Sequence, residues 1–178
     1  MVAQLETPQF DASQHPAYQV EGLLHVFTGP QRQFFTSVLA RSLTVAAQGT
    51  PTLVVQFFKG GIGQGRDRPM QLGQNLDWLR CDLARDISET QPEAGELQAL
   101  QQLWGHAQQA IQQGQYGLVV LDELSLALQH EFIPQAEVLQ LLAQRPAPIE
   151  LVLTGPQMPA AILERADRVT EVRRSHQP

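Results

Sequence analysis

Thr28 and Gly29 are the first residues of this sequence whose types and placement suggest chemistry. They follow an apolar stretch (LLHVF, residues 23–27) and precede an amphipathic one. A turn from strand to helix binds phosphate well, because glycines let backbone N–H groups approach the oxygens and the helix dipole adds to the attraction. Such a loop also needs a lysine for the phosphates and a hydroxyl for Mg²⁺. The turn here instead reads PQRQFFT, residues 30–36.

A pair of carboxylates, Asp122 and Glu123, follows a second apolar stretch (GLVVL, residues 117–121). Carboxylates in this place hold Mg²⁺ and position water in nucleotide-hydrolysing and phosphoryl-transfer proteins. Carboxylates at a helix start also cap the helix and interact with its dipole. Both interpretations stay open, and Asp122 is a magnesium ligand only if a nucleotide binds.

Lys59 is the only lysine, and it begins the glycine-rich loop KGGIGQG, residues 59–65. Any chemistry that needs an ammonium group must use Lys59. The loop resembles the KGGxGK[ST] variant of the phosphate-binding loop, but Gln64 and Gly65 stand where that variant has lysine and a hydroxyl. We therefore expect a loop beside the pocket, with anion binding by Lys59, Arg66 and Arg68 as the alternative.

Apolar runs and helical periods alternate along the chain. They predict strands at residues 23–28, 52–58, 76–81, 117–121, 149–154 and 168–172. They predict helices at residues 35–46, 96–113, 124–131, 134–144 and 159–166, the first with Phe35, Val38, Leu39, Leu43 and Ala46 on its apolar side. This alternation predicts an α/β fold with a mostly parallel central sheet flanked by helices.

Ligands of such sheets bind at the carboxyl ends of the strands. We therefore expect four segments to meet at that edge: residues 28–32, 59–68, 122–123 and 154–155. Residues 1–21 are polar and without a period, which predicts a flexible N-terminal arm before a single domain over residues 22–178.

Composition narrows the functional class. The net charge of −6 and the pI of about 5.3 argue against binding to nucleic acid or anionic membranes. Cys81 is the only cysteine, and the five histidines show no metal-ligand spacing. No apolar run reaches the roughly 18 residues of a membrane span, and the N-terminus lacks signal-peptide features. We expect a cytoplasmic protein.

Six segments in order resemble the P-loop corrinoid adenosyltransferases, which transfer the 5′-deoxyadenosyl group of ATP to cob(I)alamin or a precursor. The segments are GLLHVFTG (22–29), VVQFFKG (54–60), LVVLDEL (118–124), EVLQLLAQRP (137–146), LTG (153–155) and ADRVTEV (166–172). The resemblance implies a P-loop NTPase (RecA-like) architecture, Mg-ATP and a corrinoid as ligands, and a homodimer.

The first loop departs from the family pattern, which is close to TGNGKGKTT. Matched by position, Thr28, Gly29 and Thr36 remain, and Arg32 stands where the pattern has a lysine. Pro30 has no N–H to offer a phosphate, Phe34 replaces the phosphate lysine, and Phe35 replaces the Mg²⁺-binding threonine. We expect Phe35 to pack, and we expect ATP binding to be weakened by roughly three or more powers of ten.

Three hypotheses follow from these departures. The first is a catalytically inactive member of the family, a pseudoenzyme, which acts as a binding or regulatory module for a partner protein. The second is a working adenosyltransferase in which Arg32, Thr36, Lys59 and Asp122 stabilise the leaving triphosphate. The third is a corrinoid or nucleotide binder without catalysis. A GFTW-like corrinoid segment has no clear counterpart, and Pro156 stands where the family has arginine in TGR.

Overall fold

A computed structural model describes residues 21–58, 70–71, 73–81 and 92–173. The described strands are β1 (Leu24–Thr28), β2 (Thr52–Gln56), β3 (Met70–Gln71), β4 (Leu76–Arg80), β5 (Leu118–Asp122), β6 (Glu150–Thr154) and β7 (Arg168–Glu171). The described helices are α1 (Thr36–Ala47), α2 (Ala94–Gln112), α3 (Leu124–Gln129), α4 (Gln135–Gln144) and α5 (Ala160–Leu163). The predicted arm, apart from Glu21, and the loop that begins at Lys59 lie outside these ranges.

The strands form one sheet in the order β3-β4-β2-β5-β6-β1-β7. Every pairing is parallel except that between β3 and β4, which is antiparallel. The predicted α/β class with a mostly parallel sheet is confirmed, and it is consistent with a P-loop NTPase. Strand β6 lies between β1 and β5, so the turns after β1 and β5 are two strand spacings apart.

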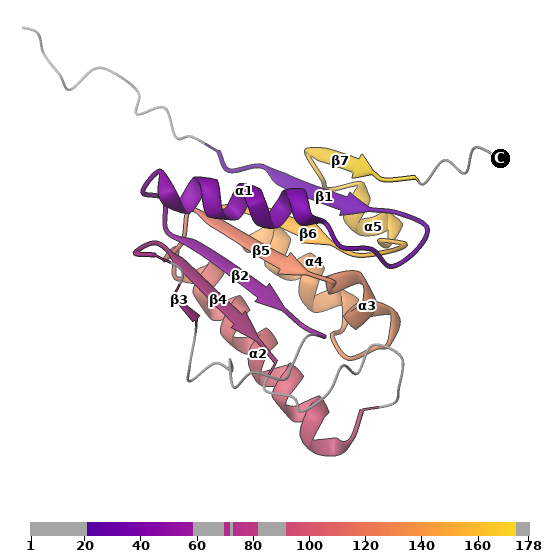
Figure 1. The fold of residues 1–178 in the computed structure, drawn as a ribbon. Helices are drawn as coiled ribbons and strands as arrows, with labels where there is room; N and C mark the ends of the chain where they lie inside the picture. Colours follow the sequence, from indigo (N-terminus) through magenta and orange to yellow (C-terminus); the bar gives the residue numbers. More distant parts are fainter. Residues whose placement is uncertain (1–20, 59–69, 72, 82–91, 174–178) are drawn as a thin grey trace, which may run out of the picture.

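The direction of each crossover explains how the helices divide between the two faces (Figure 1). The chain passes from β1 to β2 through α1, and it passes the other way along the sheet through α2, α3, α4 and α5. Since parallel crossovers are right-handed, opposite directions place helices on opposite faces. Helix α1 therefore covers one face, and the other four described helices cover the second.

Each face has its own hydrophobic cluster. The larger cluster joins α2, α3, α4 and α5 to strand residues such as Val26, Val55 and Leu121, which are fully buried. The smaller cluster joins α1 to Val54, Val120 and Val152. Residues that alternate along one strand point to opposite faces, so each central strand contributes to both clusters.

Helix α1 differs from the prediction in which side chains it buries. Val38, Ser42 and Ala46 are buried at a spacing of four residues, whereas Leu43 is 46% exposed. The prediction that Leu43 belongs to the apolar side was wrong, because Ser42 takes that place by donating its hydroxyl to Val38 O at 2.9 Å. This bond satisfies a buried hydroxyl and lets the small side chain face the sheet.

The remaining elements follow the predicted order with small shifts at their ends. The two-residue edge strand β3 was missed, and α3 and α5 are shorter than predicted. Phe57 and Phe58 follow the end of β2 instead of belonging to it, and both are fully buried. Cys81 is a small buried side chain, as expected. Among the described helices none has the length and apolar character to cross a membrane.

Candidate functional site

Polar side chains form a row at the carboxyl ends of the strands, on the face that α1 covers. Strand register creates the row, because Arg80, Gln56 and Asp122 are direct neighbours across β4, β2 and β5. Thr154 continues the row on β6, and Phe27 is its neighbour on β1. The row lies where open α/β sheets bind ligands.

Asp122 accepts hydrogen bonds on both carboxylate oxygens. Gln56 Nε2 donates to Oδ2 at 2.7 Å, and Thr154 Oγ1 donates to Oδ1 at 2.7 Å. The amide of Gln56 is fixed in turn, because Trp78 Nε1 and Arg80 Nε both donate to its Oε1 at 2.9 Å. Asp122 is therefore the acceptor of a hydrogen-bonded chain that ties β4, β2, β5 and β6 together.

Glu123 occupies a sharp turn between β5 and α3. Its backbone is left-handed (φ 63°, ψ 25°), a conformation that costs a non-glycine residue about 1–3 kcal/mol. Its N–H donates to Thr154 Oγ1 at 2.9 Å, which links this turn to the Asp122 chain. Glu123 stands at the N-cap of α3, but its side chain makes no capping hydrogen bond, so that part of the interpretation was wrong.

The Glu123 carboxylate pairs with Arg32 from the first loop. Arg32 Nε lies 2.6 Å from Oε1, and Nη2 lies 3.0 Å from Oε2, so the contact is bidentate. The carboxylate side chain is only 5% exposed and the arginine side chain is 31% exposed, so the carboxylate is buried and the guanidinium is partly open to solvent. Charged hydrogen bonds are stronger in this fork geometry than single contacts. The structure thus brings together two residues predicted for the site, 91 positions apart.

The Thr28–Pro30 turn is held by the turn that follows β6. Gln157 N donates to Gly29 O at 2.9 Å, and Gln157 Nε2 donates to Pro30 O at 3.3 Å. Met158 N donates to Thr28 Oγ1 at 3.2 Å. The first loop is therefore fastened on one side by Gln157 and Met158 and on the other by Arg32.

The aromatic residues of the first loop have different surroundings. Phe35 is buried and meets Phe27 edge to face, with ring centroids 6.0 Å apart, which confirms the expected packing. Phe34 is 71% exposed. Thr36 is exposed and begins α1. The predicted ligand residue Lys59 lies outside the described residues.

Protein donors already engage the carboxylates of the row, where a magnesium ligand was predicted. Mg²⁺ prefers carboxylate, substrate and water oxygens in an octahedron. Both Glu123 oxygens already accept from a guanidinium, and both Asp122 oxygens accept from neutral donors. The described residues contain no group of three or more His, Cys, Asp or Glu side chains that could hold a metal.

His25 lies beside the row on β1 and is buried, as expected for a packed residue. Its Nε2 is 2.9 Å from Thr170 Oγ1, and its ring centroid is 4.2 Å from that of Phe27. Burial, followed by the charges of Arg168 and Arg41, lowers the pKa of His25 below its ordinary value of 6.5.

This lowered pKa predicts a pH-dependent stability. The unfolded chain binds a proton near pH 6.5 and the folded chain only at lower pH, so the contribution of His25 is complete above about pH 6.5 and is lost as the pH falls. We expect the free energy of unfolding to fall as the pH drops from about 7.5 to about 5.5, and we expect this fall to be smaller in His25→Gln. Urea titration of both proteins across this pH range measures the difference. Identical pH slopes for the two proteins would contradict this assignment.

Sequence reasoning missed three residues of the site, Gln56, Arg80 and Gln157. Each of them bonds to residues far away in the chain. A signal existed for Gln56, since a glutamine at the end of an otherwise apolar strand is a buried polar group that needs partners. Those partners depend on strand order, which the sequence does not show.

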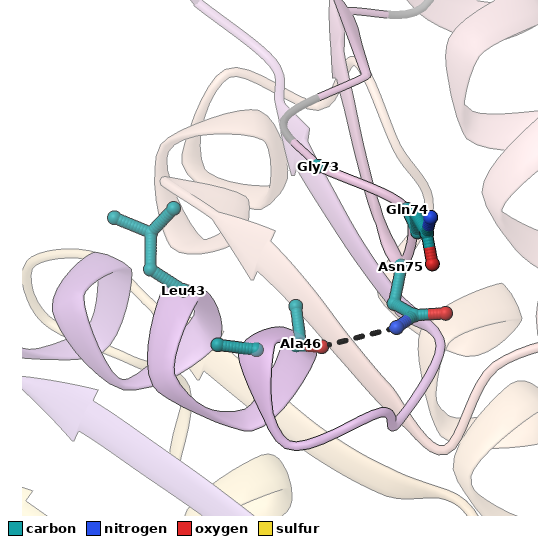
Figure 2. A pocket seen from close by; sticks show the side chains of 6 residues that line it. Leu43, Ala46, Gly73, Gln74 and Asn75 are labelled. Carbon is teal, nitrogen blue, oxygen red and sulfur yellow. Dashed lines mark hydrogen bonds between the residues drawn. The ribbon is translucent and has the colours of Figure 1, made fainter.

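An open hollow of about 540 Å³ lies at the opposite end of the strands, away from this site. Figure 2 shows Leu43 and Ala46 of α1 on one side and the segment from Gly73 to Asn75 on the other. Asn75 Nδ2 donates to Ala46 O at 3.2 Å, which fixes the segment before β4 to the end of α1. The hollow is separate from the predicted ligand-binding edge.

Comparison with known proteins covers almost all of the chain. The family described as ATP:corrinoid adenosyltransferase BtuR/CobO/CobP matches residues 20–178. A corrinoid adenosyltransferase of Escherichia coli (strain K12) is 29% identical over 164 residues, which span 92% of this chain and 82% of that protein. One from Sinorhizobium sp is 29% identical over 164 residues (85% and 72%), and corrinoid adenosyltransferase CobA of Salmonella typhimurium is 26% identical over 171 residues (92% and 82%).

Proposed function

Because the chain belongs to the ATP:corrinoid adenosyltransferase family, we propose that it is a divergent member that keeps the fold without the ATP chemistry and acts as a binding or regulatory module. The observation that carries this proposal is the bidentate pair between Arg32 and Glu123. A cation from the protein itself occupies the carboxylate that would otherwise face a metal and a triphosphate.

The first loop supports the same function. Pro30 offers no N–H, and the carbonyls of Gly29 and Pro30 accept from Gln157. Phe35 is committed to the smaller hydrophobic cluster, so a hydroxyl residue for Mg²⁺ is missing at this position. The missing N–H at Pro30 and the missing hydroxyl at position 35 both weaken triphosphate binding.

Calorimetric titration with Mg-ATP tests the proposal, together with a transfer assay containing ATP, Mg²⁺ and chemically reduced cobalamin. We expect no heat at micromolar to low millimolar ATP, because several phosphate contacts are missing and each tenfold loss corresponds to about 1.4 kcal/mol. We expect no adenosylated product. The Escherichia coli relative, which is named for the transfer activity, is the positive control. Micromolar binding together with product formation would overturn the proposal.

A working adenosyltransferase is the second candidate, and the observation that favours it is the presence of Asp122 and Glu123 at the carboxyl end of β5. In that case Asp122→Asn abolishes product formation in the transfer assay. Cobalamin titration without ATP separates a third function, a corrinoid binder without catalysis, because binding changes the absorbance of the corrinoid. Self-association is a separate proposal, which light scattering tests.

A further inference from the structure

His130 is an exposed histidine at the carboxyl edge of the sheet. It follows α3, which lies at the end of the sheet toward which β2 and β5 point (Figure 1). Its ring centroid is 6.2 Å from that of Phe58, which follows β2 shortly after Gln56 of the polar row. The imidazole therefore lies beside the end of β2, at the edge where open α/β sheets bind ligands.

The turn that ends α3 fixes the direction of this ring. Glu131 has a left-handed backbone (φ 55°), and its N–H donates to Leu128 O at 3.1 Å. The N–H of Phe132 donates to Ala127 O at 2.9 Å. These two bonds form a Schellman motif, which satisfies the last carbonyls of a helix. The motif places the rings of His130 and Phe132 almost parallel, at 18° with centroids 5.3 Å apart.

The stacked rings are anchored in the core. Phe58 is fully buried, and the half-buried Phe132 packs against the larger hydrophobic cluster with its ring centroid 6.1 Å from that of Phe58. Such aromatic pairs contribute about 0.5–1.5 kcal/mol beyond the area they bury. Within the part of the chain that the structure describes, no group forms a hydrogen bond with either ring nitrogen of His130. The fold thus presents a fixed imidazole whose lone pair is available to a ligand.

The chemistry of this group selects the class of ligand. Neutral imidazole binds transition metals through a ring nitrogen. The described residues contain no group of three or more His, Cys, Asp or Glu side chains that could hold a free metal ion. A metal inside a macrocycle needs only an axial ligand from the protein, as haem iron does from one histidine. The family to which the chain belongs acts on corrinoids, whose cobalt lies in such a ring.

We propose that His130 is the axial nitrogen ligand of a corrinoid cobalt bound at the carboxyl edge. The inference rests on the proposed function, since it names the ligand that the binding module takes. In the binding step His130 donates the lone pair of a neutral ring nitrogen to cobalt(III), and the water molecule that held this position leaves. No group is oxidised or reduced.

The test is a titration with diaquacobinamide, a corrinoid that has no axial base of its own, followed by absorbance and without ATP. We expect the natural protein to shift the cobinamide spectrum. We expect no shift with His130→Phe, because phenylalanine keeps a ring over Phe132 but has no nitrogen. After chemical reduction to cobalt(II), the paramagnetic resonance spectrum with the natural protein is expected to show splitting by one nitrogen nucleus. No shift with the natural protein, or the same shift with His130→Phe, overturns the proposal.

His106→Gln is the matched control, because His106 is a half-buried histidine of α2. We expect it to shift the spectrum as the natural protein does, and a loss equal to that of His130→Phe would overturn the assignment to position 130. His130→Gln keeps the test decisive if His130→Phe does not fold. The transfer assay is read separately: adenosylated product overturns the proposed function, whereas an absent shift with the natural protein overturns only the role of His130.

Discussion

Replacing Gly155 by alanine is expected to lower the free energy of unfolding by about 2–4 kcal/mol. Gly155 has φ 137°, a region that side-chain-bearing residues rarely adopt. A Cβ at this position would overlap Ser125 Oγ and lie 3.2 Å from the Ser125 backbone nitrogen. Ser125 cannot move aside easily, because it is fully buried and its hydroxyl donates to Pro156 O at 2.5 Å.

Gly105→Ala is the control for this substitution. Gly105 lies within α2, and a Cβ there would meet nothing within 4 Å. Alanine at an open helical position stabilises by about 0.5–1 kcal/mol relative to glycine. Urea denaturation of both variants checks the pair of expectations. A loss at Gly155 that is no larger than the usual scatter of surface substitutions, about 0.5 kcal/mol, would show that this turn is not tightly packed.

The second large effect is expected from Thr154→Val, at about 2–4 kcal/mol of stability lost. The fully buried Thr154 hydroxyl donates to Asp122 Oδ1 and accepts from the N–H of Glu123. Valine has nearly the same shape, so packing changes little. The change leaves a buried N–H without this acceptor and takes one of the donors from a buried carboxylate.

Thr52→Val is the comparison for Thr154→Val. Thr52 is also fully buried, but its hydroxyl makes one hydrogen bond, to Thr50 O at 3.0 Å. We expect a loss of about 1 kcal/mol from this variant in the same denaturation assay. If the two valine variants are equally stable, the Asp122 chain contributes less than its geometry implies.

The order and type of the main elements could be predicted because their signals are local. Buried parallel strands appear as short apolar runs, as in residues 118–121, and helices appear as a period near 3.6, as in α2. Strand β3 had no such signal, since Met70 and Gln71 are both exposed at the sheet edge. The position of β6 between β1 and β5 depends on how the whole chain is connected, so no single segment of the sequence predicts it.

The candidate site could be predicted only where the position of a residue follows from local sequence patterns. The location of Thr28, Gly29, Asp122 and Glu123 at one edge follows from parallel strands alone. The pairing of Arg32 with Glu123 does not, because it joins residues 91 positions apart through a particular side-chain direction. The left-handed backbone of Glu123 could not be predicted from the sequence either, since this conformation is unusual for glutamate.

The unequal covering of the sheet has a kinetic consequence. Native proteins open in cooperative units, and the smaller cluster can open when only α1 moves, whereas the larger one requires several helices to separate. The loop that carries Arg32 leads directly into α1, so a fluctuation that lifts this helix also draws Arg32 away from Glu123. We therefore expect the contact between Arg32 and Glu123 to open at the rate at which this 12-residue helix opens.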